Sequence, residues 1–193
     1  MQRGDRMKPI FQWRYALMLL LCYPLLIAHA AGGFDISEFS AHLDDDTYYL
    51  NADVDYRLTE APLEALQNGV PLTFEVHVQL RRSGAWLWES DLFEVRLRYQ
   101  LKYHALAELY QVIELASGSE QNFVTRDAAL AALGKIRNIG LIKQDQLEPG
   151  QSYGLSIKSV LDIEALPLPL RPMAHLTPDW NLSSERKLWY LRP

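Results

Sequence analysis

Hydrophobic and polar residues alternate along three long segments of the chain, residues 48–58, 72–80 and 93–103. A period of two is typical of a β-strand with one dry and one solvated face, and antiparallel sheets usually contain such strands. The apolar positions are Tyr48, Leu50, Ala52, Val54, Tyr56, Leu58, Leu72, Phe74, Val76, Val78, Leu80, Phe93, Val95, Leu97, Tyr99, Leu101 and Tyr103. We therefore expect three antiparallel strands whose core faces carry these side chains.

Turn-forming residues separate these strands from shorter ones. A first strand is expected near residues 34–43, and the alternation resumes at residues 153–157. Turns are predicted at 44–46 (Asp-Asp-Asp), 83–84 (Ser-Gly), 117–119 (Ser-Gly-Ser) and 149–150 (Pro-Gly), and the Ser-Gly pair indicates a hairpin. A shift in the apolar phase between Trp88 and Phe93 predicts a bulge or a strand break near residues 89–91.

Two short segments carry the features of helices. Residues 59–66 begin with Thr59 as an N-cap candidate and contain an early proline, while residues 126–138 follow Thr125 and are rich in alanine and leucine. Both helices interrupt strands rather than alternate with them. The predicted fold class is therefore mainly β, an antiparallel β-sandwich with one or two short appended helices, with α+β as the alternative.

The C-terminal part of the chain differs in character from the rest. Residues 166–172 read LPLPLRP, and the prolines remove alternate amide donors, so we expect an extended segment near polyproline II. Such a segment blocks unwanted strand pairing at an edge, or alternatively serves as a ligand for an aromatic groove. A last strand is expected from residues 180–184 and 189–191.

The first thirty residues have the features of a secretory signal peptide. A basic start precedes an apolar run at residues 16–28, and the small residues Ala28 and Ala30 form a cleavage site. An uncleaved inner-membrane anchor is the alternative, although this run is shorter than the roughly 20 residues that span a bilayer. The mature protein is then one β-rich domain over residues 31–193, with a proline-containing segment at 166–193, and it meets a membrane only if the leader is retained.

Cleavage after Ala30 changes the composition of the working protein. It removes Cys22, the only cysteine, and shifts the net charge from −5 to −8 because four basic residues and one acidic residue leave. Nucleic-acid binding needs clustered cations, and adsorption to anionic lipid needs a basic surface. The sequence therefore argues against nucleic acid as a partner and against thiol chemistry.

No catalytic, metal or cofactor residue is predicted. The histidines of the mature chain, His42, His77, His104 and His175, are widely separated, and the acidic run at 44–46 lacks the ligand spacing of a calcium loop. The chain has no Gly-x-Ser-x-Gly motif and no phosphate-binding glycine loop. We therefore expect a protein that is not an enzyme. A hydrolase would need His77 or His104 beside both an acid and a hydroxyl.

Five large or charged side chains are candidates for an interaction surface. Tryptophans anchor interfaces as well as cores, and a stripe of arginines can bind an anion or pair with neighbouring glutamates. The candidate residues are Trp86, Trp88, Trp180, Arg96 and Arg98. Core packing for the tryptophans and cross-strand charge pairing for the arginines are the alternative interpretations.

Seven short motifs follow one another in an order found in a known family. They are NGVPL (68–72), WLWE (86–89), LKYHAL (101–106), YQV (110–112), ALAALG (129–134), LPLPL (166–170) and DWNLSS (179–184). Together they resemble the bacterial domain of unknown function 4390 family over most of residues 34–185. Members are exported proteobacterial proteins with a proline-containing C-terminal part, so the resemblance implies a Gram-negative periplasm. It implies no activity, ligand or catalytic residue.

Taken together, these features predict an exported periplasmic β-sandwich that acts by protein–protein contact. The expected partner is an unidentified protein of the cell envelope, and no cofactor is expected. The alternative function is a carrier that holds a lipid or another apolar small molecule between the sheets.

Overall fold

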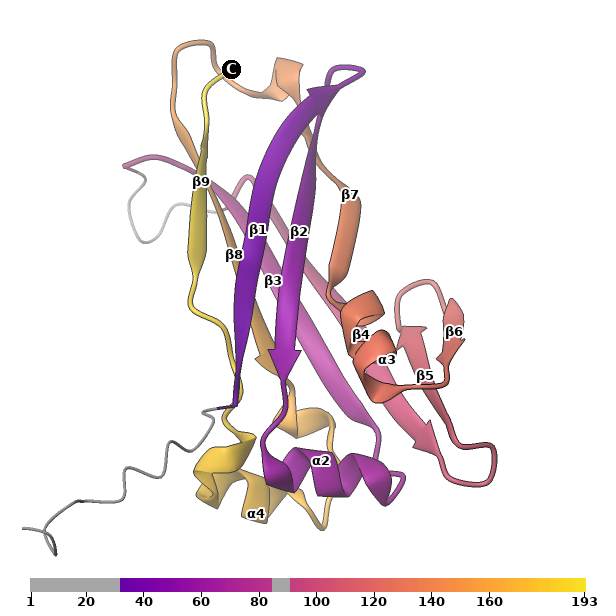
Figure 1. Cartoon of the computed structure of the whole chain (residues 1–193). Helices are drawn as coiled ribbons and strands as arrows, with labels where there is room; N and C mark the ends of the chain where they lie inside the picture. Colours follow the sequence, from indigo (N-terminus) through magenta and orange to yellow (C-terminus); the bar gives the residue numbers. More distant parts are fainter. Residues whose placement is uncertain (1–31, 85–90) are drawn as a thin grey trace, which may run out of the picture. The chain divides into compact units, whose positions relative to one another are not determined.

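The structure, a computed structural model, describes residues 32–84 and 91–193 and contains two antiparallel sheets (Figure 1). The three-stranded sheet has the order β1-β2-β7, with β1 Gly33–Asp44, β2 Thr47–Arg57 and β7 Lys135–Lys143. The six-stranded sheet has the order β6-β5-β4-β3-β8-β9. Its strands are β3 Leu72–Arg82, β4 Phe93–His104, β5 Leu109–Glu114, β6 Glu120–Phe123, β8 Tyr153–Leu161 and β9 Lys187–Leu191. Residues Gly32–Pro193 form one compact unit.

The two sheets enclose a filled apolar core, which confirms the sandwich. All five predicted core side chains of β3 are fully buried, and the predicted apolar positions of β2 from Tyr48 to Tyr56 are buried as well. β3 and β4 pair in register from Leu72 opposite Leu101 to Leu80 opposite Phe93, as expected for the hairpin. The chain is therefore mainly β with short helices. The bulge predicted at 89–91 falls largely outside the described residues.

An aromatic cluster joins the two sheets at the end of the sandwich where β1 and β3 begin and β2 ends. The ring of Tyr56 on β2 lies 4.7 Å from that of Phe34 on β1 and 4.8 Å from that of Phe74 on β3, between ring centroids. The Tyr56 hydroxyl also shares a buried hydrogen bond of 3.1 Å with the Ser159 hydroxyl on β8. Burial raises the pKa of the Tyr56 phenol, because a phenolate there would lose its hydration.

Raising the pH above about 10 is expected to destabilise the protein through Tyr56. The unfolded chain releases the phenol proton near pH 10, whereas the folded protein retains it. Tyr56 therefore contributes stability that is complete below about pH 10 and is lost as the pH rises towards the folded-state pKa. Urea denaturation from about pH 8 to 11 should show a steeper loss for the wild type than for Tyr56→Phe. Equal slopes for the two proteins would contradict this role.

Three α-helices lie among the described residues, α2 Glu60–Gln67, α3 Arg126–Leu133 and α4 Arg171–Leu176. Short 3-10 turns cover η2 Gln144–Gln146, η3 Ile163–Ala165 and η4 Pro178–Trp180. The helix predicted at 59–66 is confirmed as α2. Thr59 occupies the N-cap position of α2, but its hydroxyl donates to the Asp179 carbonyl rather than capping the helix.

The helix predicted at 126–138 ends five residues early, so that part of the prediction is wrong. The Thr125 hydroxyl caps α3 by accepting from the Ala128 amide, but residues from Lys135 onward form β7. The reason is a close approach of two backbones at Gly134. The Val54 amide donates to the Gly134 carbonyl at 3.0 Å, and a Cβ atom on Gly134 would overlap the Val54 carbonyl oxygen.

The extended conformation predicted for residues 166–172 is also wrong for most of the segment. Leu166 has polyproline II dihedral angles, but residues 168–170 form a turn and α4 starts at Arg171. Pro172 lies in the first turn of α4, where no amide donor is needed and the fixed φ of proline suits a helix. The last strand is confirmed at residues 189–191 as part of β9. Residues 180–184, in contrast, make only an isolated bridge at Ser183.

Candidate functional site

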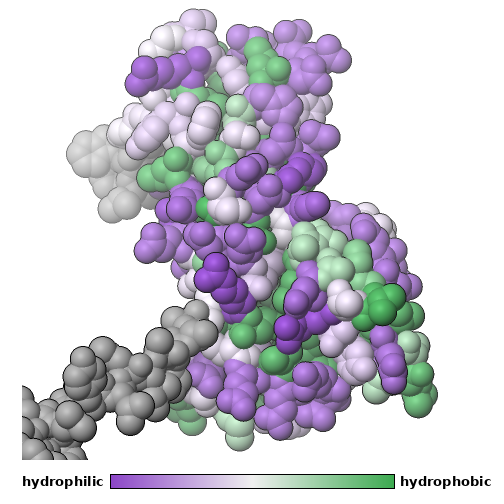
Figure 2. Space-filling view, viewed as in Figure 1, coloured by the Kyte–Doolittle hydropathy of each residue, from purple (hydrophilic) through white to green (hydrophobic). Residues whose placement is uncertain are grey.

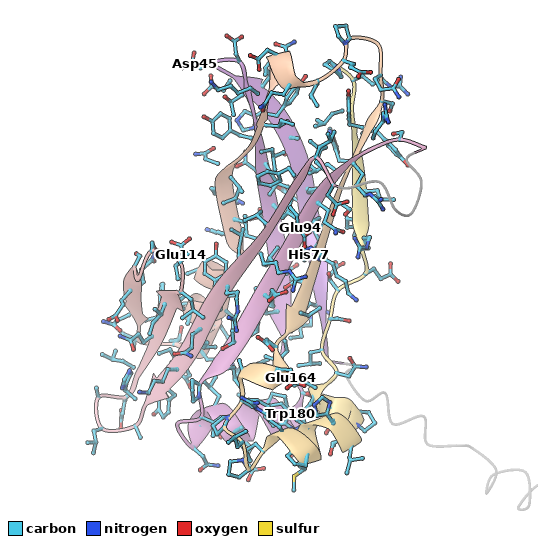
Figure 3. The ribbon with its side chains drawn as sticks, turned by 180° about the vertical axis from the view of Figure 1, so that it is seen from behind. Asp45, His77, Glu94, Glu114, Glu164 and Trp180 are labelled. Atoms are coloured by element: carbon cyan, nitrogen blue, oxygen red, sulfur yellow. The ribbon has the colours of Figure 1, made fainter. Side chains whose placement is uncertain are left out.

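The structure places the predicted tryptophans differently from the predicted arginines. Trp86 and Trp88 lie outside the described residues. Trp180 is only 5 % exposed and belongs to the core near α4 (Figure 3). Trp180 is therefore a packing residue, and the exposed interaction surface predicted from it is not found at that position.

Arg96 and Arg98 lie on the outer face of β4, and acidic neighbours neutralise both. Arg96 lies 3.5 Å from Glu94 and 3.7 Å from Glu75, measured between nitrogen and carboxylate oxygen. Arg98 donates to Asp162 at 2.8 Å and lies 3.8 Å from Glu75. This is the cross-strand charge pairing named as the alternative interpretation, so this stripe offers a weak site for an external anion.

His77 and His104, the histidines of the six-stranded sheet, hydrogen-bond to neighbouring side chains, and these contacts suit a structural role better than a catalytic one. His77 Nε2 lies 2.8 Å from a Glu94 carboxylate oxygen (Figure 3), and this hydrogen bond holds the pKa of Glu94 below its usual range. The strand neighbours of His77 are Arg96 and Lys158, which supply no hydroxyl. His104 instead bonds the Gln111 amide at 2.9 Å. Within residues 32–84 and 91–193, no three acidic, histidine or cysteine side chains are placed to share a metal ion.

Strand β9 exposes three consecutive large apolar side chains. Leu188 is 57 % exposed, Trp189 41 % and Tyr190 60 %. Because neighbouring residues of a strand point to opposite faces, Leu188 and Tyr190 lie on the outer face of the sheet and Trp189 on the inner face. In its own sheet β9 pairs with β8 alone, so its second backbone edge forms no strand pairing, and β9 also lies close to β1 of the other sheet (Figure 1).

The other edge strands of the two sheets expose mainly polar side chains. β6 presents Glu120, Gln121 and Asn122 to solvent, and β1 and β7 are exposed mostly at charged or small polar positions. Charges on an edge normally discourage pairing with another chain. Among the sheet edges of the described residues, β9 is therefore the one that combines an open backbone edge with a run of exposed apolar side chains.

The outer face of the six-stranded sheet is hollowed beside β9. Gly154 and Ser156 on β8 form the floor, opposite Tyr190 and Leu188 of β9 in the strand register. The hollow has a volume of about 330 Å³, and its cationic lining residues are Arg81, Arg82 and Arg186. Arg186 crosses the floor and donates to Gln79 at 2.8 Å and to Ser156 at 3.1 Å. We call β9 together with this hollow the β9 site.

Sequence reasoning located part of this site but assigned it no function. The sequence predicts a last strand from residues 180–184 and 189–191, yet the interaction candidates are Trp86, Trp88, Trp180, Arg96 and Arg98. A usable indication was present, because Leu188, Trp189, Tyr190 and Leu191 form an apolar run without alternation. A strand with such a run places apolar side chains on both faces, and an edge strand cannot bury all of them.

Two further apolar areas lie on helices. Leu168, Met173 and Leu176 are exposed on and beside α4, and Val124 is exposed beside α3 and β6, where Figure 2 shows hydrophobic colouring. Neither area adjoins an open apolar strand edge. We therefore take the β9 site as the candidate functional site.

Comparisons with known proteins support the family resemblance. Among the described residues no helix is both long and apolar enough to cross a membrane. No curated protein and no solved structure matches the chain. A family model described as a domain of unknown function, DUF4390, matches residues 31–190, and the chain therefore belongs to the DUF4390 family.

Proposed function

We propose that this protein is an exported, periplasmic interaction module without enzymatic activity. It binds an extended segment of an envelope protein, which adds as a further strand beside β9. The single observation that carries this proposal is the edge strand β9, with Leu188, Trp189 and Tyr190 exposed in a row. Export rests on the basic start, the apolar run and the Ala28–Ala30 cleavage site of the leader.

The physical argument for strand addition concerns both the backbone and the side chains of β9. An edge strand presents unpaired N–H and C=O groups that can hydrogen-bond a second chain. In strand-addition complexes these backbone bonds supply affinity, and the flanking side chains supply specificity. An added strand beside β9 would cover Leu188 and Tyr190 on one face and Trp189 on the other, which removes exposed apolar surface from water.

The filled core favours an interaction module over the alternative, a carrier of apolar molecules. Leu50, Phe74, Val76 and Ile157 are among the fully buried side chains between the sheets. A hollow at the β4–β7 side, lined by Tyr99, Val112, Leu133 and Ile139 among others, has a volume of about 240 Å³. Ligand pockets usually measure roughly 300–1,000 Å³, so this space suits no lipid of ordinary size.

Site-specific photo-crosslinking in the source cells tests the proposed function. A photoreactive phenylalanine analogue at position 190 preserves an aromatic ring at a 60 % exposed site. We expect a discrete protein adduct whose cross-linked peptide maps to one extended segment of the partner. The matched control carries the same analogue at position 106, where Leu106 is fully exposed on the β4–β5 turn.

The result at position 106 determines what an adduct at position 190 means. Equal labelling of the same proteins from both positions would indicate random collision and would contradict the proposal. Absence of any adduct from position 190 would contradict it as well.

A further inference from the structure

The β9 site is basic although the chain as a whole is acidic. The net charge of the protein is −5. The chain around β9 nevertheless reads Glu185-Arg186-Lys187-Leu188-Trp189-Tyr190-Leu191-Arg192, and Arg81 and Arg82 line the adjoining hollow. On the β3 side, Arg81 pairs with Asp91 at 2.8 Å. Arg186 and Lys187 before the exposed apolar run and Arg192 after it therefore place positive charge at both of its ends.

Arg186 is held in place by neutral groups rather than by a carboxylate. Its contacts to Gln79 and Ser156 both involve Nη1, and among the described residues no acidic side chain forms an ion pair with it. A guanidinium group carries five N–H donors in a fixed plane. The two neutral acceptors thus orient Arg186 and leave other N–H donors of its guanidinium group for a carboxylate. Carboxylates bind arginine well through bidentate hydrogen bonds.

We infer that the segment bound at the β9 site is acidic, with aspartate or glutamate alternating with apolar residues. This inference rests on the proposed function and specifies its partner. In an added strand with this alternation, the apolar residues lie on the inner face beside Trp189, and the carboxylates lie on the outer face. There they lie between Arg192 at one end of β9 and Arg186, which crosses the hollow at the other end. Opposite charges on neighbouring strands favour pairing, and like charges oppose it.

The same charges argue against a second copy of this chain as the occupant. An antiparallel pair of β9 strands centred on Trp189 would place Arg186 of one copy opposite Arg192 of the other. Such a pair would bring like charges together at both ends of the strand. An acidic partner segment meets no such repulsion.

Peptides of defined charge test the inference. Three extended peptides of about ten residues, the length of a long strand, alternate valine with glutamate, threonine or lysine, and each carries a neutral fluorophore. We expect fluorescence anisotropy with the full chain to show the glutamate peptide binding at least about tenfold more tightly than the threonine peptide. Added NaCl should weaken the glutamate peptide most, because salt screens exposed charges.

Variants of the exposed cations localise the effect. Arg186→Gln and Arg192→Gln are each expected to weaken binding of the glutamate peptide several-fold and to leave binding of the threonine peptide unchanged. Lys102→Gln is the matched control, because Lys102 is a cation on the outer face of β4 away from the β9 site. Thermal unfolding of every variant verifies that the fold is retained.

Each contrary result has a distinct meaning. Equal binding of the glutamate and threonine peptides, or the same loss in Lys102→Gln as in Arg186→Gln, would overturn the acidic partner while leaving strand addition intact. Binding of none of the peptides, together with a mapped adduct at position 190, would also overturn the acidic partner. Co-sedimentation with phosphatidylglycerol vesicles that depends on Arg186, without binding of the glutamate peptide, would replace the protein segment by a lipid surface. Failure of the crosslink at position 190 would instead remove the proposed function.

Discussion

Phe74→Ala is expected to lower the free energy of unfolding by about 3–5 kcal/mol, the usual cost of removing a fully buried phenylalanine side chain. Phe74 is completely buried near the start of β3, between the two sheets. Its ring contacts Phe34 and Tyr56 of the opposite sheet, with ring centroids 5.6 Å and 4.8 Å away. The substitution therefore leaves a cavity at the point where the two sheets meet. Urea denaturation followed by tryptophan fluorescence measures the loss.

Val124→Ala is the control for Phe74→Ala. Val124 is 78 % exposed beside α3, so its truncation should change the stability by no more than about 0.5 kcal/mol. A loss below about 1.5 kcal/mol for Phe74→Ala would show that the sheets can close the cavity, contrary to the tight packing described above.

Gly134→Val is expected to cost about 3 kcal/mol, at the upper end of the range for overpacking a buried site. Any side chain at position 134 collides with the Val54 carbonyl oxygen. That atom belongs to the backbone of β2, so the collision cannot be relieved by rotating a side chain. The substitution should separate the end of α3 from β2 and break the hydrogen bond from the Val54 amide to the Gly134 carbonyl. Thermal and urea unfolding both measure the effect.

Gly140→Val separates this collision from a general effect of valine in β7. Gly140 is exposed on β7, and an added Cβ atom there would lie 3.6 Å from the Tyr49 ring, an ordinary contact. Valine also suits a strand better than glycine. We therefore expect little change or a small gain in stability for Gly140→Val. A similar loss for both variants would contradict the explanation given for Gly134.

The strands that alternate strictly in sequence were the easiest part of the fold to predict. In β2 and β3 every second side chain is buried because one face of each strand lies against the opposite sheet. This burial pattern depends only on the residues of the strand itself, so a short stretch of sequence is enough to predict it. β5 and β6 gave no comparable pattern. Neither strand was predicted, because they are short and only Val112 among their residues is buried.

The errors arose where distant contacts override local preference. Residues 135–138 continue an alanine-rich helical run, yet Ile136 pairs opposite Ala52, which lies far away in the sequence. Burial of Ile136 against β2 outweighs helix propensity, which is a weak prior. In the same way, Pro167 and Pro169 predict an extended segment. Pro167 instead precedes a turn at residues 168–170 that contains Pro169 and leads into α4.

The candidate site could not be derived from sequence because strand order decides which strand is an edge. Trp86, Trp88 and Trp180 are candidates because tryptophans anchor interfaces as well as cores. The run from Leu188 to Leu191 becomes informative only once β9 is known to be the last strand of its sheet. Local patterns report which face of a strand is dry, whereas they carry no information about how many neighbours the strand has.

β9 has a single neighbour in its sheet, and this affects the free energy at which β9 detaches from the fold. Elements with few buried contacts open at a lower free energy than the whole domain. If β9 detaches, β8 becomes the edge strand of the sheet. Its side chains Leu155 and Ile157, which are fully buried in the intact protein, then lie along that edge. The rate at which that second, more apolar edge becomes accessible is then set by the local opening of five residues and not by global unfolding. A partner strand that replaced β9 would therefore bind at a rate limited by this opening, whereas one that lies beside it would not.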